Sequence, residues 1–320
     1  MGVTRTTKAL GIDGTRLTLD GKPFFFQGLS FFNALFNPNF NRSDADRLHW
    51  LQVFKANGIS CLRVWCEWDF PAPRLFCDVG PGHSLFTRNG DIWDEYFERL
   101  SKLIVAADSL EMVIEVCMFA NESEPYFLPM PAADNAARQL TERLCPFGNI
   151  IQQVWNEHSI EWLRYVKIIK EVDPQRIVTS APGFVIDRSR PFDHIGSEEH
   201  NKAVDVLTPH TVRREVFPFW YCAPAQIAWL LDTYKKPVID DEPARNGPTQ
   251  FGGIEGGTRP EQHIAHCMRT RAVGGYYTYH HDMFQYGYGN PLTPPSGIPD
   301  PDFSAFHRKV FDYLRDHPTW

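Results

Sequence analysis

Short apolar runs alternate with amphipathic segments along most of the chain, and this alternation restricts the possible folds more than any other feature of the sequence. Each run is rich in β-branched or aromatic residues and is bounded by turn or polar residues, as buried strands are. The segments between the runs repeat their apolar residues at helical spacing. Roughly eight strand–helix units follow one another, which predicts an α/β fold, a (β/α)8 TIM barrel.

Several of these units have recognisable ends. Ser43-x-x-Asp46 is a capping-box signature that opens a helix, and Asn57-Gly58 ends it. A doubly wound open sheet is the alternative, but no G-x-G-x-x-G motif follows the first strand. The strand candidates are Phe24–Gly28, Ile59–Trp65, Met112–Met118, Ile150–Trp155, Arg176–Ser180, Val204–Leu207, Pro237–Asp240 and Gly274–Tyr279.

The N-terminal segment has a different pattern. Turn signals at Asp13-Gly14 and Asp20-Gly21 predict a short β-hairpin, and we expect residues 1–22 to close the bottom of the barrel. No internal repeat and no break in composition divides the rest of the chain. The sequence therefore predicts one domain, a single catalytic barrel over residues 1–320.

Charge and cysteine usage exclude several classes of protein. The net charge is −7 and the chain has no dense run of lysine and arginine, so neither nucleic acid nor an anionic membrane is an expected partner. No apolar stretch is long enough to span a bilayer, and no signal peptide is apparent. The seven cysteines are scattered without a C-x-x-C pair. We interpret them as reduced thiols of a cytoplasmic protein.

Polar residues follow the predicted strands, where barrel enzymes carry their chemistry. Glu157 follows the fourth strand and Glu242 the seventh, on opposite sides of the expected mouth. Asp240 and Asp241 compete with Glu242, because alternation along a strand separates neighbours only weakly. Two carboxylates that flank a cavity are typical of glycoside hydrolysis, in which one protonates the leaving oxygen and the other attacks the anomeric carbon.

Asn156-Glu157 at the end of the fourth strand, together with Glu242 at the end of the seventh, resembles clan A of the retaining glycoside hydrolases, and its cellulase-like enzymes in particular. The resemblance runs from about Leu17 to Tyr313. It implies that Glu157 is the acid/base and Glu242 the nucleophile. It further implies that Asn156 binds the sugar 2-hydroxyl, that Arg63 supports the nucleophile, and that His210 is the histidine of strand six.

The same mechanism sets electrostatic and geometric expectations. A nearby guanidinium would hold the pKa of Glu242 down, whereas burial and the charge of Glu242 would raise the pKa of Glu157. In a retaining enzyme the two carboxyl groups lie about 5–5.5 Å apart. We expect no cofactor and a carbohydrate substrate, whose sugar and linkage remain open together with the oligomeric state.

The sequence also departs from the clan's pattern. Tyr279 and His281 occupy the region of the expected strand-eight tryptophan, and the His-x-Tyr of strand six is reduced to His210-Thr211-Val212. A non-catalytic carbohydrate-binding barrel is therefore an alternative. The predicted substrate-binding residues are Asn156, Arg63, His210, Tyr279, Trp68, Glu67, His281 and Trp220.

His280-His281-Asp282 raises a second alternative, a metal-dependent hydrolase. Adjacent residues of a strand point to opposite faces, so only one of the two histidines can face the barrel axis. The H-x-H expected after the first strand of metal-dependent barrel hydrolases is absent from the sequence. We therefore predict no metal ligands. Each candidate side chain also has a simpler interpretation: Arg63 as a structural ion-pair partner, His210 as a core histidine, and the aromatic residues as core packing.

Overall fold

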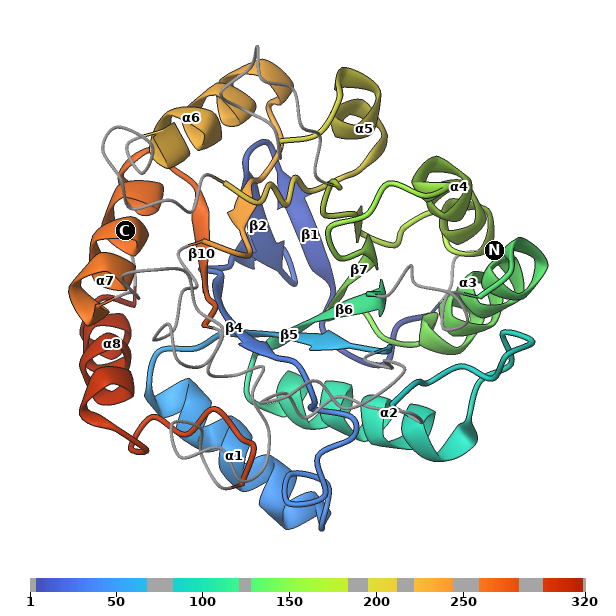
Figure 1. Ribbon diagram of the computed structural model, residues 1–320, viewed down its shortest axis with the longest axis horizontal. Coiled ribbons are helices and arrows are strands. Elements are labelled where there is room, and N and C mark those ends of the chain that lie inside the picture. Colours follow the sequence, from blue (N-terminus) through green and yellow to red (C-terminus); the bar gives the residue numbers. More distant parts are fainter. Residues whose placement is uncertain are drawn as a thin grey trace.

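Parallel strands form the centre of the molecule, and a ring of helices surrounds them (Figure 1). The computed structural model describes residues 4–67, 83–120, 128–183, 195–211, 222–243, 259–281 and 296–318. Seven strands pair in the order β8-β7-β6-β5-β4-β10-β9, and every pairing between them is parallel. They are β4 (Gln27–Phe31), β5 (Cys61–Trp65), β6 (Val113–Phe119), β7 (Ile150–Trp155), β8 (Val178–Thr179), β9 (Ile239–Asp240) and β10 (Tyr276–Tyr279).

The segment 204–208 closes the gap between β8 and β9. Asp205 N donates to the Val178 carbonyl at 2.9 Å on one side. On the other side, Leu207 N donates to the Pro237 carbonyl at 2.9 Å, and Ile239 N donates to the Leu207 carbonyl at 2.8 Å. The predicted strand Val204–Leu207 is thus too short to pair as a regular strand, yet it completes the ring. The prediction of a (β/α)8 barrel is confirmed.

The first helix begins and ends at the predicted positions. Ser43 caps α1, and its side chain accepts a hydrogen bond from Asp46 N as the capping-box signature predicts. The helices are α1 (Asp44–Ala56), α2 (Asp94–Ser109), α3 (Met130–Leu144), α4 (Trp162–Val172), α5 (Glu198–Ala203), α6 (Cys222–Tyr234), α7 (Pro260–Ala272) and α8 (Ala305–Asp316). The first and last predicted strands begin three and two residues too early, because β4 starts at Gln27 and β10 at Tyr276.

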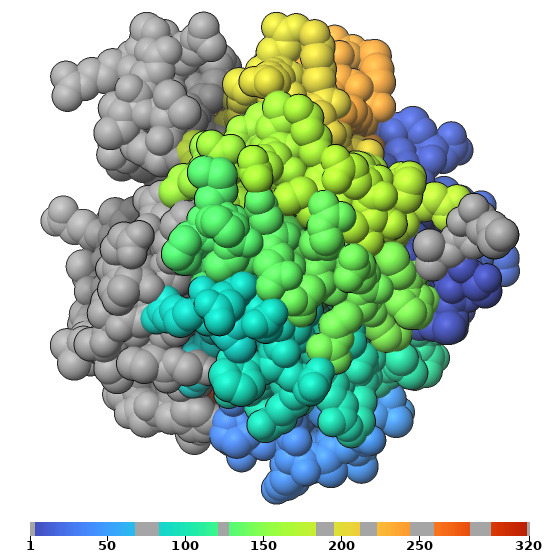
Figure 2. Space-filling view, turned by 90° about the vertical axis from the view of Figure 1, so that its right-hand side faces the viewer, coloured from blue at the N-terminus to red at the C-terminus, as the bar shows by residue number. Residues whose placement is uncertain are grey.

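The N-terminal hairpin closes one end of the barrel. Its strands β1 (Leu10–Asp13), β2 (Arg16–Leu19) and β3 (Lys22–Pro23) form a separate antiparallel sheet, coloured dark blue at the right-hand side of Figure 2. Its leucines share an apolar cluster with the first inward-facing residues of the barrel strands, which are Phe26, Cys61, Val113, Ile151, Ile177, Val206, Ile239 and Tyr276. This cluster is the floor of the barrel.

Two residues further along the strands, the interior becomes polar. Arg63, Glu115 and Gln153 lie on β5, β6 and β7, and all three are completely buried. Thr179 and Thr208 bond to each other through their hydroxyls at 2.8 Å in the same layer. Side chains alternate along a strand with a period of two, so this polar layer lies between the apolar floor and the carboxyl ends of the strands.

Two other expectations concern the cysteines and the membrane. Cys61, Cys66, Cys117, Cys145 and Cys267 are free, and four of them are buried, as expected of small apolar side chains. Cys77 lies outside the described residues. Among the helices of the described ranges, none has both the length and the apolar character that crossing a bilayer requires.

Two glycines with left-handed backbones allow a test of the packing against α3. Gly90 has a φ of +78°, and a Cβ there would lie 1.8 Å from the Ala132 carbonyl oxygen. Gly14 has a φ of +58°, and a Cβ there would meet nothing within 4 Å. We expect Gly14→Ala to lower the free energy of unfolding by about 1–2 kcal/mol, the strain of the backbone alone. Gly90→Ala should lower it further, as measured by urea denaturation, and equal losses would contradict the packing described.

Candidate active site

The predicted catalytic residues meet at the carboxyl ends of the strands. Arg63 lies within β5, and Asn156 and Glu157 directly follow β7. His210 follows the closing segment 204–208, and Glu242 lies two residues beyond β9. Parallel strands present all their carboxyl ends at the same edge, so residues far apart in the sequence become neighbours.

Arg63 forms the centre of the site. Its Nη1 donates to Glu242 Oε1 at 2.7 Å, and its Nη2 donates to Asn156 Oδ1 at 2.7 Å. Its Nε and Nη2 both donate to Gln153 Oε1 at 3.0 Å. Asp241 Oδ2 lies 3.2 Å from Nη2 and also accepts a bond from Gln153 Nε2 at 3.0 Å. One buried guanidinium thus orients groups from β7 and from the segment after β9.

Glu157 and Glu242 face each other across His210. An oxygen of each carboxylate and a ring nitrogen of His210 all lie within 4.8 Å of one another. His210 Nδ1 is 2.9 Å from Glu157 Oε1 and 3.6 Å from Glu242 Oε2. The Glu242 side chain is 1% exposed, whereas that of Glu157 is 30% exposed. One carboxylate is therefore buried against a guanidinium, and the other is open to solvent at the mouth.

His210 carries a positive charge at neutral pH. Burial lowers its pKa, but Glu242 and Asp241 raise it by more, with further contributions from hydrogen bonds to Asp241 and Glu157, so that the pKa is about 9. Its Nε2 lies 3.2 Å from Asp241 Oδ1, opposite the Nδ1 that faces Glu157. The imidazolium therefore links the polar layer below to the carboxylate at the mouth.

The backbone of Glu157 is strained. Its φ is +62°, in the left-handed region that residues other than glycine rarely adopt. Such conformations cost about 1–3 kcal/mol and persist where the surroundings enforce them, often at functional sites. Here the left-handed turn follows directly on β7 and places the side chain next to His210.

Glu115 is an acid that the sequence did not single out. It is completely buried on β6, and Oε1 lies 3.8 Å from Arg63 Nε, beyond hydrogen-bond distance. Burial raises its pKa most, the Asp241 charge adds to this, and Arg63 opposes it, so that the pKa is about 8. Glu115 therefore keeps its proton at neutral pH.

The structure distinguishes the three consecutive acids Asp240, Asp241 and Glu242 at the end of β9. Asp240 accepts bonds from Thr211 at 3.0 Å and lies 2.8 Å from His266 Nε2 of α7, on the helix side of the sheet. Asp241 and Glu242 both point into the barrel, but only Glu242 is near the open side, next to Glu157.

Two of the predicted substrate-binding residues point away from the barrel axis, so this part of the prediction is wrong. Tyr279 packs its ring 5.3 Å from Phe311 and 5.4 Å from His263. His281 lies 5.0 Å from both His263 and Phe306, and burial lowers its pKa well below the ordinary value. Both therefore belong to the packing between β10 and helices α7 and α8.

His280 takes the inward position instead. Its Nε2 lies 3.7 Å from Glu242 Oε2, and its Nδ1 lies 2.9 Å from Ser30 Oγ. The two histidines do lie on opposite faces of the strand, as predicted, but the inward one is His280. Glu67 is buried just beyond β5, where its backbone bridges Ser84, and its role stays a prediction. Trp68 and Trp220 lie outside the described residues.

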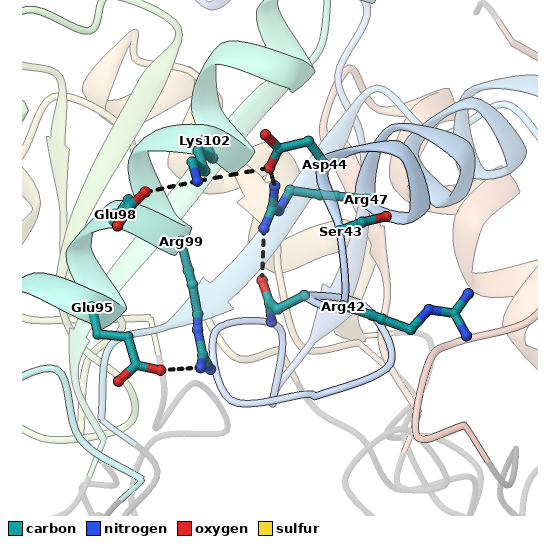
Figure 3. A pocket seen from close by; sticks show the side chains of 9 residues that line it. Arg42, Ser43, Asp44, Arg47, Glu95, Glu98, Arg99 and Lys102 are labelled. Carbon is teal, nitrogen blue, oxygen red and sulfur yellow. Dashed lines mark hydrogen bonds and ion pairs between the residues drawn. The ribbon is translucent and has the colours of Figure 1, made fainter.

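A second hollow is a less suitable site. A cavity of about 340 Å³ between α1 and α2 is lined by charged residues (Figure 3). Arg99 pairs with Glu95, Lys102 with Glu98 at 2.7 Å, and Arg47 with Asp44 at 2.6 Å. The fourth cation of the lining, Arg42, pairs with Asp46 of α1, so each cation of this cavity already has an acidic partner.

Three comparisons with known proteins bear on the fold. No family model matches the sequence, and no curated protein matches it. Solved structures do match. A glycoside hydrolase family 5 protein from Bacteroides vulgatus has a TM-score of 0.63 at 16% identity, over 98% of this chain and 70% of that one.

Two further structures match over nearly their whole length. A glycoside hydrolase family 5 mannosidase from Rhizomucor miehei, solved as a mutant, has a TM-score of 0.65 at 13% identity, over 98% of this chain and 100% of that one. A β-glucanase from Saccharophagus degradans has a TM-score of 0.65 at 15% identity, over 99% and 96%. The chain has the fold of glycoside hydrolase family 5. This agrees with the cellulase-like resemblance of the sequence.

The protonation of Glu115 can be tested through stability. The unfolded chain releases this proton near the ordinary pKa of 4.5, whereas the folded protein keeps it up to a pKa of about 8. Between these values the unfolded state binds fewer protons, so the wild type loses stability as the pH rises. Glu115→Gln removes this loss. We expect the difference in free energy of unfolding, variant minus wild type, to grow from pH 4.5 to 8 in urea titrations. A difference independent of pH would contradict a protonated Glu115.

Proposed function

We propose that the protein is a retaining β-glycoside hydrolase in which Glu242 is the nucleophile and Glu157 the acid/base. The observation that carries the proposal is that one oxygen of each carboxylate lies within 4.8 Å of the other and of a ring nitrogen of His210. Retaining enzymes hold their carboxyl groups about 5–5.5 Å apart, whereas inverting enzymes need about 6.5–9.5 Å to admit a water molecule. The separation supports direct attack by a carboxylate.

The environments of the two glutamates support these assignments. Glu242 must be ionised to attack, and Arg63 Nη1 at 2.7 Å stabilises that charge. Glu157 is in contact with solvent, from which the second half of the reaction takes its water. Asn156 accepts a hydrogen bond from Arg63 and lies next to Glu157 and Glu242, where its side chain can contact the 2-hydroxyl of the sugar.

The proposed reaction has two displacements. In the first, Glu242 Oε2 bonds to the anomeric carbon as the glycosidic bond breaks, and Glu157 gives its proton to the leaving oxygen. In the second, Glu157 takes a proton from water, and the resulting hydroxide displaces Glu242 from the same carbon. The hydrogen bond from His210 keeps Glu157 oriented in both steps, and the proton can rest on either member of the pair.

The substrate class follows from the comparisons and remains a proposal. Solved neighbours include mannosidases, an endo-1,4-β-mannanase and a β-glucanase, which favours a β-mannoside or β-glucoside. Five free cysteines support a reducing, cytoplasmic setting. The packing of the N-terminal hairpin on the barrel floor supports a single catalytic unit over residues 1–320.

Kinetics of Glu157→Gln test the proposal and the non-catalytic alternative together. We expect the wild type to hydrolyse an aryl β-mannoside or β-glucoside. The variant should lose about 10²–10⁴-fold in kcat/KM on a substrate with a poor leaving group, because general acid catalysis is missing. The loss should be much smaller with a dinitrophenyl leaving group, which departs without a proton. Equal losses on both substrates would argue against Glu157 as the acid. If the wild type turns over neither the aryl β-mannoside nor the aryl β-glucoside, a non-catalytic binding barrel is favoured.

A further inference from the structure

We propose that Glu157, His210, Glu242 and His280 also form a binding site for one divalent transition-metal ion, and that the bound ion blocks hydrolysis. Glu157, His210 and Glu242 each direct one donor atom toward the same space, and His280 Nε2 lies 3.7 Å from the donor oxygen of Glu242. The inference goes beyond the proposed hydrolase, because it concerns binding of a metal ion in the absence of sugar.

The distances between the donor atoms support such a site. His210 Nδ1 lies 3.6 Å from Glu242 Oε2, and His280 Nε2 lies 3.7 Å from the same oxygen. In a tetrahedral zinc site with bonds of 2.0–2.1 Å, neighbouring donor atoms are about 3.3 Å apart. These two spacings are within a few tenths of an ångström of this value, whereas the donor oxygens of Glu157 and Glu242, within 4.8 Å of each other, need to approach. His210 Nδ1 and Glu157 Oε1, at 2.9 Å, need to separate slightly.

The partners of the two imidazoles orient them for a metal. Metal-binding histidines usually donate their other N–H to a carboxylate, hydroxyl or carbonyl, which fixes the tautomer. His210 Nε2 lies 3.2 Å from Asp241 Oδ1, and His280 Nδ1 lies 2.9 Å from Ser30 Oγ. When a metal ion displaces the second proton of the His210 imidazolium, the outer nitrogens keep their protons and the nitrogens that face Glu242 each offer a lone pair.

The charges of the surrounding groups match a divalent ion. Glu157, Glu242 and Asp241 bring three negative charges, and Arg63 brings one positive charge. An ion of charge +2 completes the balance. Arg63 bonds to Oε1 of Glu242, so Oε2 remains on the side of the two histidines.

The donor set also indicates which ions bind. Two imidazoles with two carboxylates suit Zn²⁺, Co²⁺, Ni²⁺ or Cu²⁺, whereas Mg²⁺ and Ca²⁺ require oxygen ligands. An ion in this position lies between the acid/base and the nucleophile of the proposed reaction. It would occupy Glu242 Oε2 and hold Glu157 without a proton, so both displacements would stop.

Metal binding by the tag-free full chain tests the site directly, without a substrate. We expect one equivalent of Zn²⁺ by calorimetry and visible absorption bands of tetrahedral Co²⁺, with no response to Mg²⁺. His280→Gln and Glu242→Gln should each weaken Zn²⁺ binding by at least 100-fold. Ser30→Ala, which removes only the hydroxyl next to His280 Nδ1, should weaken it by about 10–100-fold. The control is His49→Gln, which changes an exposed histidine of α1 and should leave binding unchanged.

Three results would overturn the proposal. They are the absence of saturable Zn²⁺ binding to the wild type, unchanged binding in folded Ser30→Ala and Glu242→Gln, and loss of binding in His49→Gln.

Inhibition of hydrolysis by the bound ion is tested separately. Zn²⁺ should inhibit aryl glycoside turnover and a chelator should restore it, whereas activity that a chelator abolishes and Zn²⁺ restores would overturn the blocking. If no aryl glycoside is turned over, the binding result still stands on its own.

Discussion

The buried guanidinium of Arg63 is the interaction on which the rest of the site depends. Removing a charge from water costs several kcal/mol unless the surrounding groups compensate it with charge and hydrogen bonds. Here Gln153, Asn156 and Glu242 accept its hydrogen bonds, and Asp241 lies 3.2 Å away. These partners come from β7 and from the segment after β9. The contacts that compensate the charge of Arg63 therefore also connect the two sides of the barrel mouth.

A balance of charge extends from Arg63 through the polar layer to the mouth. Asp241 and Glu242 face two cations, Arg63 and the protonated His210. Glu115, with a pKa of about 8, adds no charge at neutral pH. The buried part of the site is therefore close to neutral, and the partly exposed Glu157 lies at its edge, 2.9 Å from His210 Nδ1.

The sequence predicted the barrel because alternation of strands and helices requires no tertiary information. It also predicted which residues meet at the candidate site, because Asn156, Glu157 and Glu242 lie within two residues of the ends of recognisable strands. It failed on β10, where Tyr276, Tyr277 and Tyr279 are aromatic on both faces and the pattern cannot show which face is inward. Period-two alternation from Tyr276, which lies in the barrel floor, assigns the inward position to His280.

Glu115 and Gln153 escaped notice for a different reason. Both stand inside largely apolar strands, Glu115 alone and Gln153 beside Gln152, and a few polar residues there do not change the overall apolar pattern. Their partner is Arg63, which is more than 50 residues away, and only the closed barrel brings the three together. A buried polar residue inside a strand needs a partner, and this need was the signal that the sequence offered.

Covalent trapping tests most directly whether the carboxylate held by Arg63 is the one that attacks the sugar. An activated 2-deoxy-2-fluoro β-mannoside or β-glucoside forms the glycosyl-enzyme but releases it slowly, so the modified residue can be found by peptide mass spectrometry. We expect the loss of activity to be proportional to the incorporation of one label per molecule, on Glu242. Full inactivation with the label on Asp241, Glu157 or any other residue would contradict it.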